Sequence, residues 1–129
     1  MEIYLSKTLG NTNFADAESR VIDKLKEQGF GVITEIDVQA TFKAKLNVDF
    51  KPYKILGACN PHFAHSVLSK NDKIGVMLPC NVCLQQISEN SVEVFTINPL
   101  EAMKAMNDQG AEELAGQVYT KLSAMLQSL

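Results

Sequence analysis

The sequence predicts an α+β domain in which helices pack on one face of a largely antiparallel sheet of about five strands. Alternating segments of strand length are joined at 89–91 by a short polar turn, which is typical of antiparallel pairs. The helical stretches at 14–28 and 111–128 each carry one apolar stripe, which must be buried against another layer. With 129 residues, 46% of them hydrophobic, the chain is expected to form a single domain, 1–129, without disulfides or metal.

The first elements are predicted from periodicity and from residues that begin or end helices. Residues 1–8 alternate and predict an edge strand. Asn13 has the chemistry of an N-cap, and Gly29 that of a helix end. Residues 30–36 predict a second strand. Asp37 then caps a short helix that ends at a left-handed Asn47 and has the inner stripe Val38, Phe42 and Leu46.

The second half continues in the same manner. A third strand is expected at 53–59, and Asn60-Pro61 predicts a helix start, with the cap followed by proline in the first turn. The inward residues of that helix are Ala64, Val67 and Leu68. Residues 74–88 and 92–97 predict two more strands. Pro99 opens a short helix, which Gly110 separates from a final helix with the stripe Leu114, Val118, Leu122, Leu126 and Leu129.

Charge and hydropathy exclude several functional classes. The net charge is −3 and the isoelectric point is about 5.3, without the Lys/Arg cluster that nucleic-acid binding requires. No apolar run approaches the ~20 residues of a membrane span, and the N-terminus does not have the pattern of a signal peptide. The odd cysteine count of 3 predicts free thiols in a reducing cytoplasm.

Two short cysteine segments form the candidate site. Gly57-Ala58-Cys59-Asn60-Pro61 and Leu78-Pro79-Cys80-Asn81 each place a thiol beside an asparagine and a proline at the end or kink of a strand. Strand pairing is expected to bring Cys59 and Cys80 closer to each other than either is to Cys83. Where the segments meet we expect a ligand pocket lined by Cys59, Asn60, Cys80 and Asn81. Glu35 is a weaker candidate, as a carboxylate near Lys54 or the cysteines.

Longer stretches of the chain resemble the domain-of-unknown-function family 302. They are 29–32 with 34–38 (Thr-Glu-Ile-Asp-Val), 50–61 (ending Gly-Ala-Cys-Asn-Pro) and 78–82 (Leu-Pro-Cys-Asn-Val). The resemblance covers essentially the whole chain. It implies a compact α+β fold with a curved antiparallel sheet and helices against it, often as a homodimer. It implies no reaction, because the family itself lacks an established one.

Three chemical alternatives remain for the cysteines and histidines. Cys80-Asn81-Val82-Cys83 has the spacing of a redox pair or of half a zinc site. An extended strand, however, separates residues three apart by roughly 10 Å and turns them to opposite faces. A disulfide needs Cα atoms within about 4.4–6.8 Å, so this geometry disfavours a redox pair. Cys59, ahead of a helix start, is a reactive thiol, a ligand or a buried core residue. His62 and His65, with the cysteines including Cys83, are candidate metal ligands.

The sequence therefore favours two functions and leaves two others open. The favoured ones are a domain that binds a small molecule or cofactor near the Cys-Asn segments, and a structural homodimer or protein-interaction module without chemistry. The others are an enzyme or redox sensor that uses Cys59, and a metal- or haem-binding module. No sequence feature completes a catalytic set of residues or identifies a cofactor.

Overall fold

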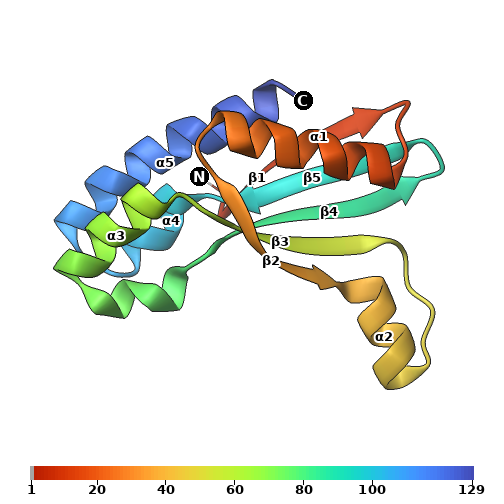
Figure 1. Ribbon diagram of the computed structural model, residues 1–129, viewed down its shortest axis with the longest axis horizontal. Helices are drawn as coiled ribbons and strands as arrows, with labels where there is room; N and C mark the ends of the chain where they lie inside the picture. The colour runs from red at the N-terminus through yellow and green to blue at the C-terminus, as the bar shows by residue number, and fades with distance from the viewer. Residues whose placement is uncertain (1) are drawn as a thin grey trace.

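The computed structural model describes residues 2–129. Its centre is an open sheet in the order β1-β5-β4-β3-β2, in which every neighbouring pair is antiparallel. Two helices, α1 (Phe14–Glu27) and α5 (Gln109–Gln127), lie across one face of the sheet (Figure 1). The predicted α+β class is confirmed. The strands are β1 (Tyr4–Gly10), β2 (Gly31–Asp37), β3 (Tyr53–Cys59), β4 (Cys80–Ser88) and β5 (Ser91–Ile97).

The length of α1 fits the width of the sheet. The helix connects β1 to β2, which are the two edge strands. Four inter-strand gaps of about 4.8 Å make a span of about 19 Å, and the helix of 14 residues is about 21 Å long at 1.5 Å per residue. One crossing therefore carries the chain from one edge of the sheet to the other while the apolar stripe of α1 covers the strands between.

The core lies between the sheet and these two helices. Strand alternation turns four fully buried residues of β4 and β5 toward the helices: Val82, Leu84, Val92 and Val94. They meet the stripes of α1 and α5, whose fully buried members are Val21, Leu25, Leu122 and Met125. The intervening residues of the strands face the opposite side, and within residues 2–129 no helix crosses that side (Figure 1).

The predicted helix caps are confirmed. The side chain of Asn13 accepts a hydrogen bond from the Asp16 backbone N–H at 2.8 Å. Asp37 accepts one from Ala40 at 2.9 Å, and Asn60 accepts one from His62 at 3.2 Å. Asn47 has a φ of 52° and ends its helix in the left-handed conformation. Each cap satisfies a backbone group that a helix end leaves without a partner.

The predicted stripe of the short second helix is wrong. This helix, α2 (Val38–Leu46), projects from the edge of the sheet away from α1 (Figure 1), and not one of its nine described residues is buried. Val38 and Phe42 are half-buried, and Leu46 is 65% exposed. Phe42 packs edge-on against the Phe50 ring, with centroids 5.1 Å apart, but the end of the stripe at Leu46 stays exposed because α2 extends past the strands it connects.

The expected strand at 74–88 begins later than predicted. After α3 (Pro61–Lys70), residues Asp72–Met77 form a 3₁₀ helix, η1, which the Asn71 side chain caps. Ile74 of η1 is only 1% exposed, because it is buried under α3. The apolar residues that indicated a strand here therefore serve the burial of a 3₁₀ helix. A cis Leu78-Pro79 bond precedes β4.

Three smaller expectations also change. The strand predicted over 1–8 is displaced to Tyr4–Gly10, and Met1 lies outside the described residues. Gly110 does not separate the last helices, because the Asp108 side chain caps α5 and places Gly110 in its first turn, after α4 (Pro99–Lys104). Leu68 is 36% exposed rather than inward. Within residues 2–129, no helix is both long and apolar enough to cross a membrane.

Candidate functional site

An apolar pocket of about 310 Å³ lies where the end of the sheet meets α3, α4 and α5. The sheet contributes Ala58 and Cys59 at the end of β3 and Cys80 at the start of β4. The helices contribute most of the remaining wall. Their lining residues are Phe63, Ala64, Val67 and Leu68 of α3, Pro99 and Met103 of α4, and Ala111, Leu114, Ala115 and Val118 of α5. We call this space the cysteine pocket.

Small side chains on facing helices leave the pocket empty. Ala111 and Ala115 are one turn apart on α5, and Ala64 faces them from α3. Protein interiors are normally close-packed, and a larger apolar residue at any of these positions would fill the space that the alanines leave open. Within residues 2–129, the lining includes no charged side chain. The volume is at the lower end of the ~300–1,000 Å³ typical of small-molecule sites.

The two predicted cysteines meet at this pocket. Ala58 of β3 pairs directly with Cys80 of β4, so the next residue, Cys59, lies diagonally across the ladder from Cys80. Both thiols line the pocket, and both are half-exposed as whole residues. Burial, with a smaller contribution from the nearby Cys59, raises the pKa of the Cys80 thiol to about 11. Cys80 is therefore held as a neutral thiol at physiological pH.

We expect Cys80 to alkylate slowly until strongly alkaline pH. A pKa of about 11 rather than 9.0 leaves about 100-fold less thiolate at pH 8. The rate of reaction with iodoacetamide, followed at Cys80 by mass spectrometry, should therefore rise up to about pH 11. An inflection near pH 9, as in the urea-unfolded chain, would show that the thiol is not desolvated.

The same shift predicts a pH dependence of stability. Because the folded pKa of Cys80 lies above its unfolded value, the folded state holds the proton more tightly. The free energy of unfolding should then be undiminished below about pH 9 and fall as pH rises from about 9 to about 11. Cys80→Ser should remove this component of the alkaline decrease.

The asparagines of the two segments have different surroundings. Asn60 lines the cysteine pocket, and its side-chain oxygen accepts hydrogen bonds from His62 and Phe63 as the cap of α3. Asn81 is exposed and lines a second hollow on the other face of the sheet, together with Cys83. Alternation along β4 separates Asn81 from Cys80. The structure therefore places Cys59, Asn60 and Cys80 in one pocket and Asn81 and Cys83 outside it.

Gly57 is surrounded closely by neighbouring segments of the chain. A Cβ at this position would collide with the Thr34 hydroxyl, and it would lie 2.9 Å from Cγ of Pro79. Both contacts come from neighbouring segments of the chain on the side of the sheet away from the core. Glycine is needed here because the Thr34 side chain and Pro79 occupy the space that a larger residue would need.

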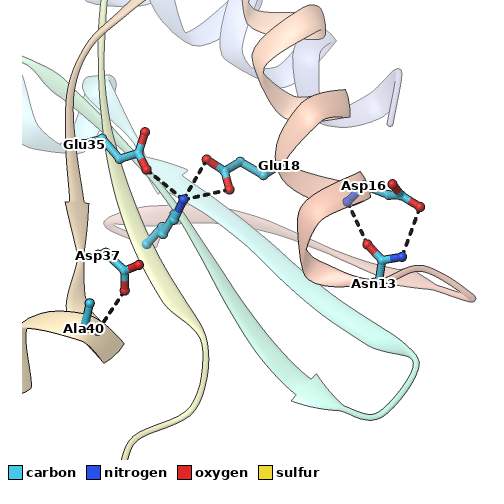
Figure 2. A network of polar contacts seen from close by, with 7 residues as sticks. Asn13, Asp16, Glu18, Glu35, Asp37 and Ala40 are labelled. Carbon is cyan, nitrogen blue, oxygen red and sulfur yellow. Dashed lines mark hydrogen bonds and ion pairs between the residues drawn. The ribbon is translucent and has the colours of Figure 1, made fainter. Parts of the chain in front are cut away.

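Glu35 belongs to an ion-pair cluster away from the pocket. Lys54 Nζ lies 2.7 Å from Glu35 Oε1 and 3.0 Å from Glu18 Oε1 of α1. Figure 2 shows Glu18 and Glu35 turned toward one another. The hydrogen bond that Lys54 donates to Glu35 is the largest cause of a raised Lys54 pKa. Burial opposes this rise, and the bond and charge of Glu18 add to it. The cluster connects β2, β3 and α1. Of the two neighbours expected for Glu35, the structure therefore shows Lys54 and not the cysteines.

The histidines and Cys83 do not converge. His62 and His65 are exposed on α3, and Cys83 lies on the opposite face of the sheet. Burial raises the Cys83 pKa, and a hydrogen bond with Tyr53 partly offsets this. Within residues 2–129, no group of three or more His, Cys, Asp or Glu side chains is arranged to hold a metal ion.

Sequence reasoning missed the helical walls of the pocket. Met103, Leu114 and Ala115 line it but are far from the cysteines in sequence. One signal was available: Ala111 and Ala115 interrupt an α5 stripe whose other members are large. Small residues within such a stripe indicate either close helix packing or a cavity, and only the structure distinguishes the two.

Comparison with known proteins agrees with this architecture. The family model described as domain of unknown function DUF302 matches residues 5–129. A solved structure described as an uncharacterized conserved protein DUF302 from Bacillus stearothermophilus is similar, with a TM-score of 0.89, 28% identity and 98% of each chain covered. No curated protein matches the chain. The matched range includes both covering helices, both cysteine segments and the whole sheet except Tyr4, and the chain belongs to the DUF302 family.

Proposed function

We propose that this protein binds a small, uncharged and largely apolar molecule in the cysteine pocket. The observation that carries the proposal is the space of about 310 Å³ bounded by the sheet end, α3, α4 and α5. Apart from Asn60, its walls are aliphatic, aromatic and sulfur-containing side chains, which lower the free energy of an apolar ligand by removing it from water. A charged ligand would lose its hydration there without gaining a partner of opposite charge.

The Cys80 thiol is better suited to contact than to reaction. A neutral Cys80, with its pKa of about 11, is a soft, polarizable wall for an apolar ligand and a poor nucleophile at neutral pH. The metal and haem alternatives have less support, because His62 and His65 lie on the exposed side of α3. Binding without covalent chemistry is therefore the function that this geometry supports best.

We also propose that the protein is a homodimer in the cytoplasm. The open sheet has two edge strands, β1 and β2, and uncovered sheet surfaces favour self-association. The three cysteines are free, as thiols are in a reducing compartment.

The binding proposal is tested by filling the pocket from α3. Isothermal titration calorimetry with 1-octanol and with naphthalene should detect saturable binding to the wild type. Ala64→Phe places a ring in the space and should weaken binding at least about 10-fold. Ala105→Phe makes the same chemical change at an exposed position after α4 and should leave the affinity unchanged.

The outcomes separate the proposal from its alternatives. Equal affinity in the wild type and in Ala64→Phe, with unchanged thermal midpoints, would place binding outside the pocket. No binding of either probe to the folded wild type would reject the apolar-ligand function. If Ala64→Phe lowers the thermal midpoint, the smaller Ala64→Leu provides a second test of the same space.

A further inference from the structure

The cysteine pocket is elongated rather than round. Its lining begins at Ile33 of β2 and reaches Pro99, the first residue of α4, which follows β5. In the sheet order β5-β4-β3-β2, these two positions are three inter-strand gaps apart, or about 14 Å. Along α5 the lining runs from Ala111 to Val118, which is about 10 Å of helix at 1.5 Å per residue. A space of about 310 Å³ extended over such a distance is a narrow channel.

A β-bulge turns Ile33 toward this channel. The pairing with β3 passes over Ile33, because Val32 before it pairs with Ala58 and Thr34 after it pairs with Gly57. Regular alternation would send one of two consecutive residues to each face of the sheet. Instead, Val32 packs against the main core and Ile33 lines the pocket on the same side. Bulges commonly redirect a side chain beside a functional site, and this one extends the pocket to the edge strand.

The channel has an open end and a closed end. Ile33 is 62% exposed, and Leu68 of α3, which also lines the space, is 36% exposed. At the other end, Met103 of α4 and Ala111 of α5 are 8% and 3% exposed. A ligand would therefore enter past Ile33 and end against Met103 and Ala111.

The channel has the width of one hydrocarbon chain. A volume of about 310 Å³ over a length of about 14 Å gives a mean cross-section of about 22 Å². Carbon atoms in contact lie about 4.0 to 4.5 Å apart, so an extended alkyl chain needs about 16 to 20 Å². A two-ring or branched molecule is wider and has to displace the walls. At about 30 Å³ for a group the size of a water molecule, the same volume holds about ten methylene groups.

The charges near the open end favour an uncharged head group. Glu35 lies two residues beyond Ile33 on β2, about 7 Å along the strand. It shares Lys54 with Glu18, so two carboxylates surround one ammonium group and the cluster is negative. A carboxylate on the ligand would be repelled there, and within residues 2–129 the pocket lining includes no charged side chain to pair with it. A hydroxyl, carbonyl or ester group can stay hydrated at the opening.

We infer that the cysteine pocket takes an unbranched alkyl chain of about ten carbon atoms with an uncharged, oxygen-containing head group at the opening. The inference rests on the function proposed above and specifies its ligand class, a medium-chain alcohol, aldehyde or ester. Ile33 contacts the part of the chain next to the head group. Met103 and Ala111 set the chain length that the pocket accepts.

Isothermal titration calorimetry with primary alcohols from 1-butanol to 1-dodecanol tests the chain length. Each added methylene should tighten binding to the wild type about 4-fold, up to about ten carbon atoms, and 1-dodecanol should bind no more tightly than 1-decanol. Naphthalene, with as many carbon atoms as 1-decanol, should bind at least about 10-fold more weakly because it is wider. Decanoate at pH 8 should also bind at least about 10-fold more weakly than 1-decanol, because its charge is opposed at the opening.

Two substitutions at the closed end should move the length limit in opposite directions. Ala111→Leu adds an isopropyl group there, so it should weaken 1-decanol binding at least about 10-fold and leave 1-hexanol binding unchanged. Met103→Ala removes most of a side chain, so 1-dodecanol should then bind at least about 10-fold more tightly than 1-decanol. Ala105→Leu, at an exposed position, is the control and should leave the series unchanged. A general loss of stability cannot produce opposite shifts, and thermal denaturation establishes that each variant is folded.

Failure of this inference and failure of the binding proposal give different results. If none of the alcohols binds, or if Ala64→Phe leaves their binding unchanged, the pocket function itself fails. If 1-octanol binds in the pocket but naphthalene binds as tightly as 1-decanol, the pocket function stands and the alkyl chain is rejected. A length limit that stays in place in both Ala111→Leu and Met103→Ala would reject it as well. Decanoate binding as tight as that of 1-decanol would overturn the uncharged head group.

Discussion

Leu122→Ala is expected to lower the free energy of unfolding by about 3 to 4 kcal/mol. Leu122 is fully buried in α5 and belongs to the cluster between the sheet and the helices. Truncation loses the burial of its side chain and leaves a cavity that the fully buried neighbours cannot close. Because domains of this size are stable by only about 5 to 15 kcal/mol, urea denaturation should show a large shift of the midpoint.

Gln117→Ala is the matched control for this substitution. Gln117 is exposed on the same helix, and alanine is a good helix former, so the free energy of unfolding should change by less than about 0.5 kcal/mol. If Leu122→Ala were as mild as this control, α5 would not be packed on the sheet in the way described.

Asn98→Ala is expected to cost about 3 kcal/mol. Asn98 is fully buried between β5 and α4. Its side-chain N–H donates to the Glu2 carbonyl at 3.0 Å, and its Oδ1 accepts from the Leu100 N–H at 3.1 Å as the cap of α4. Alanine leaves the Glu2 carbonyl and the Leu100 N–H, whose bonds to Asn98 are partly buried, without these partners, and each loss costs about 1 to 3 kcal/mol.

Asn13→Ala provides the comparison, because Asn13 caps α1 at the surface. Water replaces the lost partner there, so the cost should be about 1 kcal/mol. The difference between the two variants, measured by urea denaturation, isolates the effect of burial. Equal costs would mean that water reaches the Asn98 site and that α4 is not held against the N-terminal segment.

Local chemistry made most of the element boundaries predictable. Asn13, Asp37 and Asn60 each cap the helix that the sequence assigned to them, because capping depends on neighbouring backbone groups alone. Segment 74–79 was misjudged for a non-local reason. Its apolar pattern comes from burial of Ile74 beneath α3, which a strand and a 3₁₀ helix can both satisfy.

The candidate site was predictable only in part, for a similar reason. Pairing of β3 with β4 follows from strand order, and it brings Cys59 beside Cys80 at the pocket. The alternation that carries Asn81 to the other face is equally local and was available from the sequence. The walls contributed by α4 and α5 depend on how the C-terminal helices fold back over the sheet end, and no local pattern specifies that.

The most direct test of the central claim is methyl NMR of the wild type during titration with 1-octanol. Met103 lines the cysteine pocket, whereas Met125 is fully buried in the main core away from it. A ligand in the pocket should shift the Met103 methyl signal in a saturable manner and leave that of Met125 nearly unchanged. A shift of neither signal, or equal shifts of both, would contradict binding in this pocket.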